Sequence, residues 1–147
     1  MTNDLLLIDT LAQNIKTKIA AINAAYVTKL YDTTISLVRG KYGFNILPTE
    51  FSTREFSGVS SLPDILLDMF CYYTMNANEV RDTQWTTFLG VVNSVREALI
   101  VKAGIPSPMA TVKIDVNFHD DILEQKTGSR AINGVMSFTY KKYAYNA

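Results

Sequence analysis

The sequence predicts an α+β fold, in which a mixed or antiparallel sheet of about four strands packs against two helices. Three observations support this prediction: two segments with apolar residues at helical spacing, two C-terminal stretches that alternate apolar and polar residues, and a length suited to one core. A chain of 147 residues buries about 68–70% of its unfolded surface. We therefore expect one domain over residues 1–147, with a long N-terminal helix at about 4–30, a sheet-and-helix body at about 33–145 and a C-terminal β-hairpin.

Composition and charge exclude several classes of protein. Apolar residues make up 48% of the chain and charged residues 19%, which is ordinary for a globular domain and unlike a disordered chain. Fourteen basic side chains balance fourteen acidic ones, so no overall field attracts the protein to nucleic acid or to an anionic membrane. Cys71 is the single cysteine, which excludes an internal disulfide and a multi-cysteine zinc site. No stretch approaches the roughly 20 apolar residues that span a bilayer.

An apolar stripe predicts the N-terminal helix. Between residues 8 and 30, apolar side chains recur at spacings of three or four, and polar residues occupy the opposite face. Asn3 or Asp4 is placed to cap the start of this helix. A coiled coil is the alternative, but the pattern lasts only about three heptads and lacks paired charges beside the stripe. We therefore expect the stripe to pack on the rest of the domain.

The next segment predicts a short strand, a turn and an irregular region. Residues 33–38 are largely β-formers, and the two glycines within residues 39–43 suit a turn. Residues 44–61 combine Pro48, several Ser and Thr residues and isolated aromatics. That mixture is typical of a long loop or of a poorly formed hairpin arm.

A central strand and a second helix are predicted next. Residues 65–74 are largely apolar on both alternating faces, which favours a strand covered on both sides. Their Leu and Met residues leave a helix as the alternative, although Pro63 and the polar residues that follow Thr74 frame a segment of strand length. Over residues 82–103 apolar side chains fall at helical spacing, with Asp82 as the candidate N-cap and a glycine just beyond the end.

Two alternating stretches predict the C-terminal hairpin. The second stretch, residues 132–143, follows the same pattern as the first, residues 111–118. Burying the four apolar side chains of the first stretch contributes about 1.5–3 kcal/mol each before the entropy of ordering is counted. We expect this to fix their core-facing register. These side chains belong to Val112, Ile114, Val116 and Phe118.

The sequence contains no motif for catalysis, cofactor binding or metal binding. His119, Asp120 and Asp121 form the one cluster with metal or acid-base potential, but neighbouring side chains on an extended backbone point to opposite sides. Cys71 lies in an apolar strand without a base beside it. GxSxG, GxGxxG and P-loop patterns are absent. We therefore predict that the protein is not an enzyme and that it has no catalytic, cofactor or metal site.

Basic and aromatic residues are interleaved at residues 39–42 and 141–145. Such a combination can grip a nucleic acid backbone and stack on bases. However, the net charge is zero, Tyr and Arg are enriched at protein interfaces, and Lys on a terminal strand discourages edge-to-edge aggregation. We expect edge protection or protein contact rather than nucleic acid binding.

The order of elements resembles that of bacteriophage tail terminator proteins and related head-to-tail joining (neck) proteins. The segments that carry the resemblance are the strand at 63–73, the helix at 82–103, which is followed by Gly-x-Pro, and the closing strand at 131–140. The resemblance implies a structural virion component: a homo-oligomeric ring, often a hexamer, that caps the tail tube and joins it to the neck or head. It implies tail-tube and neck or connector proteins as partners, and neither a membrane nor specific nucleic acid. It also implies a location in the virion tail or neck, and in the host cytoplasm during assembly.

On this resemblance, two segments are expected to contact neighbouring subunits or the tail tube: residues 44–61 and residues 119–130. An exposed strand edge or loop of one subunit, completed by its neighbour, would close a ring. The candidate anchor residues are Arg54, Phe56 and Arg130.

Two other interpretations are open. One is a small-ligand-binding or enzymatic α+β domain whose site combines residues distant in sequence, such as His119 with Glu79 or Asp68. The other is a neck or completion protein of the same assembly that is not the terminator.

Overall fold

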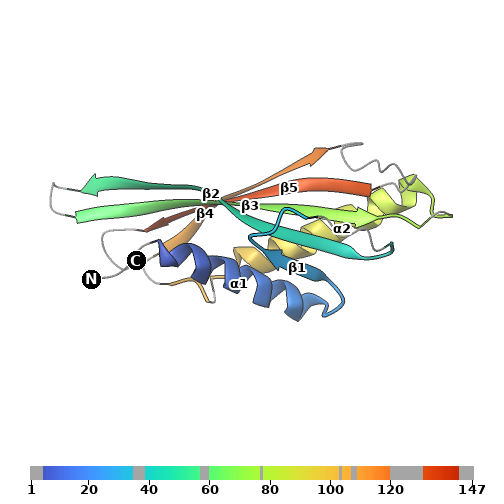
Figure 1. Ribbon diagram of the computed structural model, residues 1–147, viewed down its shortest axis with the longest axis horizontal. Helices are drawn as coiled ribbons and strands as arrows, with labels where there is room; N and C mark the ends of the chain where they lie inside the picture. Colours follow the sequence, from blue (N-terminus) through green and yellow to red (C-terminus); the bar gives the residue numbers. More distant parts are fainter. Residues whose placement is uncertain are drawn as a thin grey trace.

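The computed structural model describes residues 5–34, 39–56, 60–76, 78–102, 104–106, 109–119 and 131–142; the side chains at 54–56, 60–61, 119 and 131 lie outside this description. Two helices and a five-stranded mixed sheet form the fold (Figure 1), which confirms the predicted α+β class. The elements in chain order are α1 (Leu6–Ile22), β1 (Val27–Leu30), β2 (Tyr42–Phe56), β3 (Ser60–Thr74), α2 (Arg81–Ile100), β4 (Met109–His119) and β5 (Ala131–Lys142).

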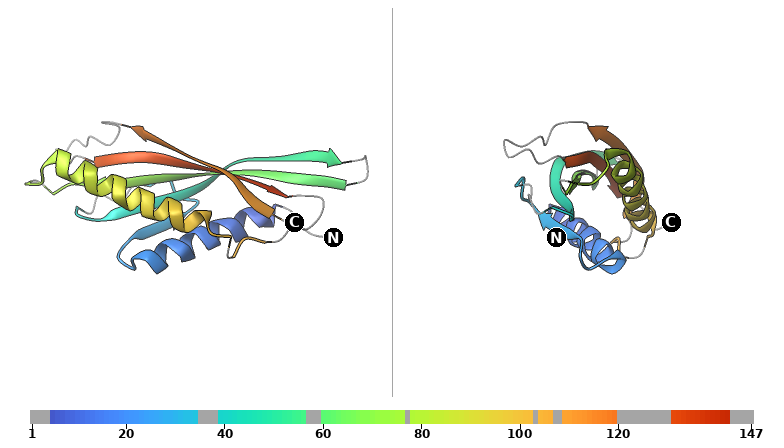
Figure 2. Two further views of the ribbon diagram at one scale, coloured as in Figure 1. Left: turned by 180° about the vertical axis from the view of Figure 1, so that it is seen from behind. Right: turned by 90° about the vertical axis from the view of Figure 1, so that its right-hand side faces the viewer.

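The strands lie in the order β1-β2-β3-β5-β4. β1 pairs with β2 in parallel, and every other neighbouring pair is antiparallel. Both helices lie on the same side of the twisted sheet (Figures 1 and 2). This side is called the covered face below, and the opposite side the outer face.

The core fills the space between the covered face and the two helices. Buried residues recur at spacings of three or four in the helices and of two in the strands, as amphipathic elements require. Helix α1 contributes a stripe that includes Leu11, Ile15 and Ile19, and α2 contributes Phe88, Val92, Val95 and Leu99. The strands contribute, among others, Phe44, Ile46, Ile65, Leu67, Met69, Cys71, Met136, Phe138 and Tyr140.

The N-terminal helix is shorter than predicted. It ends at Ile22, where the side chain of Asn23 accepts a hydrogen bond from the backbone N–H of Ala25 at 2.9 Å and supports a turn. The apolar spacing continued past this turn because Tyr26 and Leu30 pack against the same core, Leu30 from β1. Asn3 and Asp4, the candidate caps, lie outside the described residues, and the N-cap position is Leu5.

Residues 44–61 were predicted to form a long loop or a poorly formed hairpin arm, and the structure agrees with the hairpin, which is long and regularly paired. Strands β2 and β3 pair from Tyr42 with Tyr73 to Phe56 with Ser60, with a bulge between Pro48 and Glu50. A proline is tolerated there because an edge strand need not donate every N–H. Of the short strand predicted at 33–38, residues 35–38 lie outside the described part of the chain, and residues 33–34 are not in a strand.

The central strand, the second helix and the C-terminal hairpin are confirmed as β3, α2, β4 and β5. The prediction that the central strand is covered on both sides is wrong, because both helices lie on one face and residues 65–71 alternate between buried and partly exposed. Asp82 is not the cap of α2, because Val80 occupies the N-cap position; Asp82 lies in the first turn, where a negative charge still favours the helix N-terminus. The register of β4 also differs from the prediction. A bulge between Thr111 and Lys113 moves Val112 off the covered face, so Thr111 takes its place beside Ile114.

Candidate assembly interface

The sheet has two open edges within the described part of the chain. At one side β1 pairs only with residues Gly43 to Ile46 of β2, and the N–H of Tyr31 adds a bond to the carbonyl of Ile46 at 2.8 Å. From Pro48 onward, β2 therefore has no described strand on its outer side. At the other side β4 pairs with β5 alone. Such edges carry backbone N–H and C=O groups that a further strand can bind.

Both edges carry features that restrict pairing. The β2 edge has Pro48 followed by a bulge and the exposed Glu50. The β4 edge has the bulge at Val112 and the exposed Lys113, whose Nζ lies 3.2 Å from Asp115 Oδ2. Prolines, bulges and charges on edge strands discourage indiscriminate sheet extension. These features restrict which strands can pair with either edge.

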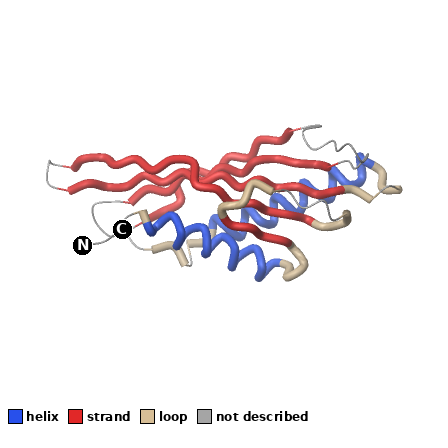
Figure 3. The backbone as a smooth tube through the Cα atoms, viewed as in Figure 1, coloured by secondary structure: helices blue, strands red, loops and turns tan. Residues whose placement is uncertain are grey.

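The β2–β3 hairpin projects past the rest of the sheet (Figure 3). Strand β3 pairs with β2 from Ser60 but with β5 only from Asp64, so the end of the hairpin is held by its own two strands. The sequence-predicted anchors Arg54 and Phe56 lie on this projecting end of β2, and their side chains are outside the described atoms. Arg130 and the loop before it lie outside the described residues.

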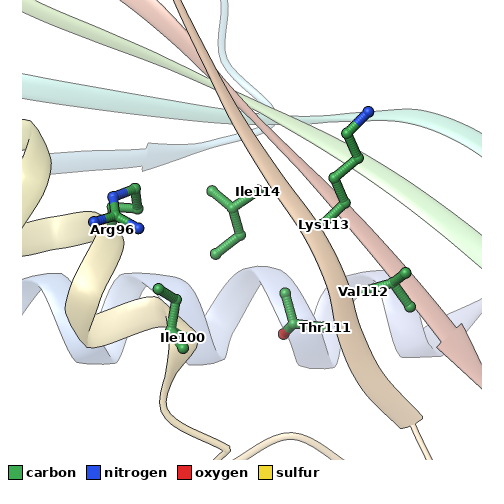
Figure 4. A pocket seen from close by; sticks show the side chains of 6 residues that line it. All are labelled: Arg96, Ile100, Thr111, Val112, Lys113 and Ile114. Carbon is green, nitrogen blue, oxygen red and sulfur yellow. The ribbon is translucent and has the colours of Figure 1, made fainter.

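A pocket of about 290 Å³ lies between the C-terminal half of α2 and the start of β4 (Figure 4). Thr111 and Ile114 point toward α2, whereas Val112 and Lys113 point away from it. The hydroxyl of Thr111 is buried without a hydrogen-bond partner, an unfavourable state that a ligand or partner relieves. The six lining residues are Arg96, Ile100, Thr111, Val112, Lys113 and Ile114.

Apolar side chains extend from this pocket along the β4 side of α2. Phe118 of β4 is 44% exposed, and its ring lies edge-on to Trp85 of α2 with centroids 5.9 Å apart. Leu89 and Ile100, both about half exposed, follow Trp85 on the same side of the helix by its periodicity. The open β4 edge is thus accompanied by a partly exposed apolar surface.

Among the candidate chemical groups, Cys71, Glu79 and Asp68 lie within the described residues, whereas the side chains of His119, Asp120 and Asp121 lie outside them. Burial raises the pKa of the Cys71 thiol to about 12, so this cysteine is unreactive at neutral pH. Glu79 accepts hydrogen bonds from Tyr73 Oη at 2.9 Å and from the backbone N–H of Asn76 at 2.6 Å, which anchors the turn before α2. Asp68 is on the outer face of β3, away from this turn. The described residues contain no group of three or more His, Cys, Asp and Glu side chains able to hold a metal ion.

The sequence gives no signal for the pocket or for the pairing of the edges, because both depend on strand order and on the bulge at Val112. No protein-family model matches the chain, and no curated protein matches it significantly. Neither helix in the described ranges combines the length and apolarity needed to cross a bilayer.

Proposed function

We propose that this protein is a structural subunit that assembles into a closed ring by pairing unlike strand edges of neighbouring copies. The observation that carries the proposal is the pair of open edges, β2 from Pro48 onward and β4, on opposite sides of one sheet. A contact between two different surfaces of identical chains is heterologous, and it produces a ring when the rotation between copies closes.

Strand directions suit this contact. β2 runs antiparallel to β3, β3 to β5, and β5 to β4, so β2 and β4 run in opposite directions. A second copy rotated alongside the first, with its covered face on the same side, therefore presents its β2 antiparallel to the first copy's β4. Antiparallel pairing extends the sheet without inverting either molecule.

Within this class we propose a tail terminator-like role, in which the ring, a hexamer, caps a phage tail tube and joins it to the neck or head. The support is the order of elements, a helix before a long hairpin and a second helix before a closing hairpin. The projecting end of the β2–β3 hairpin supplies an arm that reaches past the sheet toward a neighbouring subunit or a tube.

A second candidate function is small-ligand binding at the pocket between α2 and β4. The observation that favours it is the unpartnered Thr111 hydroxyl in a pocket that Arg96, Ile100 and Ile114 also line. This lining suits a small carboxylate with a short apolar part. Native mass spectrometry of the purified protein would detect a retained molecule of this class.

The ring proposal is tested by light scattering coupled to size exclusion, followed by negative-stain imaging of the largest species. We expect a mass of at least three chains, a concentration-dependent midpoint and circular particles. A mass of one chain at every concentration would overturn the proposal. A dimer that grows no further would also overturn it, because that state indicates a contact between like surfaces.

A further inference from the structure

The strand register identifies residues that lie at the same level on the two open edges. On the outer face Glu50 is opposite Leu66, Leu66 is opposite Thr139, and Thr139 is opposite Lys113. Direct partners in antiparallel strands project to the same face. A single row therefore crosses the sheet, with a carboxylate at the β2 edge and an ammonium group at the β4 edge.

A second row crosses the covered face one level away. Phe51 is opposite Ile65, Ile65 is opposite Tyr140, and Tyr140 is opposite Thr111. Phe51 packs against the edge of the core and is partly exposed. At the other end of this row Thr111 lines the pocket beneath α2.

The two bulges lie at the same level of the sheet and compensate each other. One extra residue follows Pro48 in β2, and one extra residue, Val112, precedes Lys113 in β4. Two residues separate Pro48 from Phe51, and two residues separate Thr111 from Ile114. Between the rows on either side of the bulges, the two edge strands therefore have the same number of residues. Each has one residue more than the inner strand with which it pairs.

We infer that the β2 edge of one copy pairs with the β4 edge of the next so that residues of the same row meet. In this register Phe51 of one copy lies opposite Thr111 of the next, and Glu50 lies beside Lys113. This inference rests on the proposed ring assembly and identifies a second copy of the chain as the occupant of the β4 edge. Opposite charges meet on the outer face, where cross-strand ion pairs stabilise a sheet. On the covered face the Phe51 ring reaches the apolar wall formed by Ile100 and Ile114.

Asp115 contributes to the same charge pattern. It lies two residues beyond Lys113 on β4, and its carboxylate already pairs with the Lys113 ammonium. In the proposed contact Lys113 is held between Asp115 of its own chain and Glu50 of the neighbour. A register shifted by two residues would lose the Glu50 contact and would set each bulge against a regular strand.

A charge-reversal cycle tests the register. Glu50→Lys places Lys beside Lys113, and Lys113→Glu places Glu beside Glu50, so each single variant puts like charges at every contact. We expect each to lower the association constant per contact by about three- to tenfold. The double variant, with both charges exchanged, restores opposite charges between copies but places the exchanged carboxylate beside Asp115 of its own chain. We therefore expect it to assemble better than either single variant and less well than the parent chain. Lys16→Glu on the exposed surface of α1 is the matched control and leaves assembly unchanged.

The two single variants also test each other when they are mixed. Each carries the complement of the other's edges, so an equimolar mixture forms alternating rings that neither variant forms as well alone. If the parent chain forms rings and the single variants assemble equally well, the register is wrong and the ring remains. If the parent chain never assembles, the ring proposal fails, and the register fails with it. Far-UV circular dichroism confirms that all variants are folded.

Discussion

Strands β4 and β5 are neighbours with the same alternating sequence pattern, yet their burial differs. Met136, Phe138 and Tyr140 of β5 are at most 2% exposed, whereas Phe118 of β4 is 44% exposed although it points to the same face. Among the described strands, β5 has a neighbour on each side and β4 has a neighbour on one side. Alternation therefore indicates which face a residue joins, while the position of the strand in the sheet decides how completely that residue is enclosed.

This difference separates residues that hold the fold from residues that remain available to a partner. Completely enclosed side chains dominate stability because their loss leaves a cavity. Half-exposed side chains on the edge contribute less to the folded monomer and retain apolar area for an interface. Four measurements, ordered by expected effect, test this separation.

The largest effect is expected from a matched pair of phenylalanines. Phe138→Ala removes a ring that is 0% exposed and should reduce the free energy of unfolding by about 3–5 kcal/mol. Phe118→Ala removes a ring from the same face at the edge and should cost about 1 kcal/mol. Urea denaturation measures both losses of stability, provided that the m-values of the variants equal that of the parent chain. Equal losses would show that the β4 edge is as enclosed as the centre.

Alanine substitutions at two glycines are expected to have the next largest effects on stability, with opposite signs. A Cβ at Gly43 would lie 2.1 Å from Cζ of Tyr72, whose ring covers this glycine on the outer face. Gly43→Ala should therefore destabilise the protein by about 1–3 kcal/mol. Gly90→Ala, within α2 and with no atom within 4 Å of the new Cβ, should stabilise it by about 0.5–1 kcal/mol. Thermal unfolding of the two variants should shift in opposite directions.

A pH titration tests the contribution of the Tyr73 hydroxyl, which is hydrogen-bonded to Glu79, to the stability of the fold. Burial, followed by the hydrogen bond to Glu79, raises the pKa of Tyr73 to about 12 from the model-peptide value of 10.0. The unfolded chain loses this proton first, so the stabilisation is complete below pH 10 and is lost as the pH rises toward 12.

Tyr73→Phe should therefore make the loss of stability over this alkaline range shallower by about one proton. The measurement is the urea midpoint at several pH values. Tyr140, whose pKa is also raised by burial, is present in the parent and in the variant and contributes equally to both slopes. An unchanged slope would show that Tyr73 has the same proton affinity in the folded and unfolded chains.

Most elements could be predicted from the sequence because local periodicity determines them. The stripe of α2 and the alternation of β3 and β5 follow directly from spacing. The end of α1 could not be predicted, because Tyr26 and Leu30 continue the apolar spacing of the helix. They lie after the helix, in the turn and in β1, and pack against the same core. The β2–β3 hairpin was concealed by Pro48 and by polar residues that an edge strand tolerates.

The residues of the candidate interface could not be predicted from the sequence. The family resemblance points to Arg54, Phe56 and Arg130, which lie in two segments whose sequences are typical of loops or arms. Glu50 and Lys113 are separated by more than sixty residues, and only the strand order places them in one row at opposite edges. The bulge at Val112 depends on how β4 meets β5, a property of the pair of strands rather than of either sequence.

Amide hydrogen exchange measured across protein concentrations tests most directly whether the two strand edges are the surfaces that join copies. We expect the exchange of β4 and of residues 48–53 to slow as the protein assembles, because each edge gains backbone hydrogen bonds. The amides of α1 and the centre of β3 should exchange at concentration-independent rates. Protection that appears on the helices, or edge amides whose exchange does not change in the assembled species, would contradict the claim.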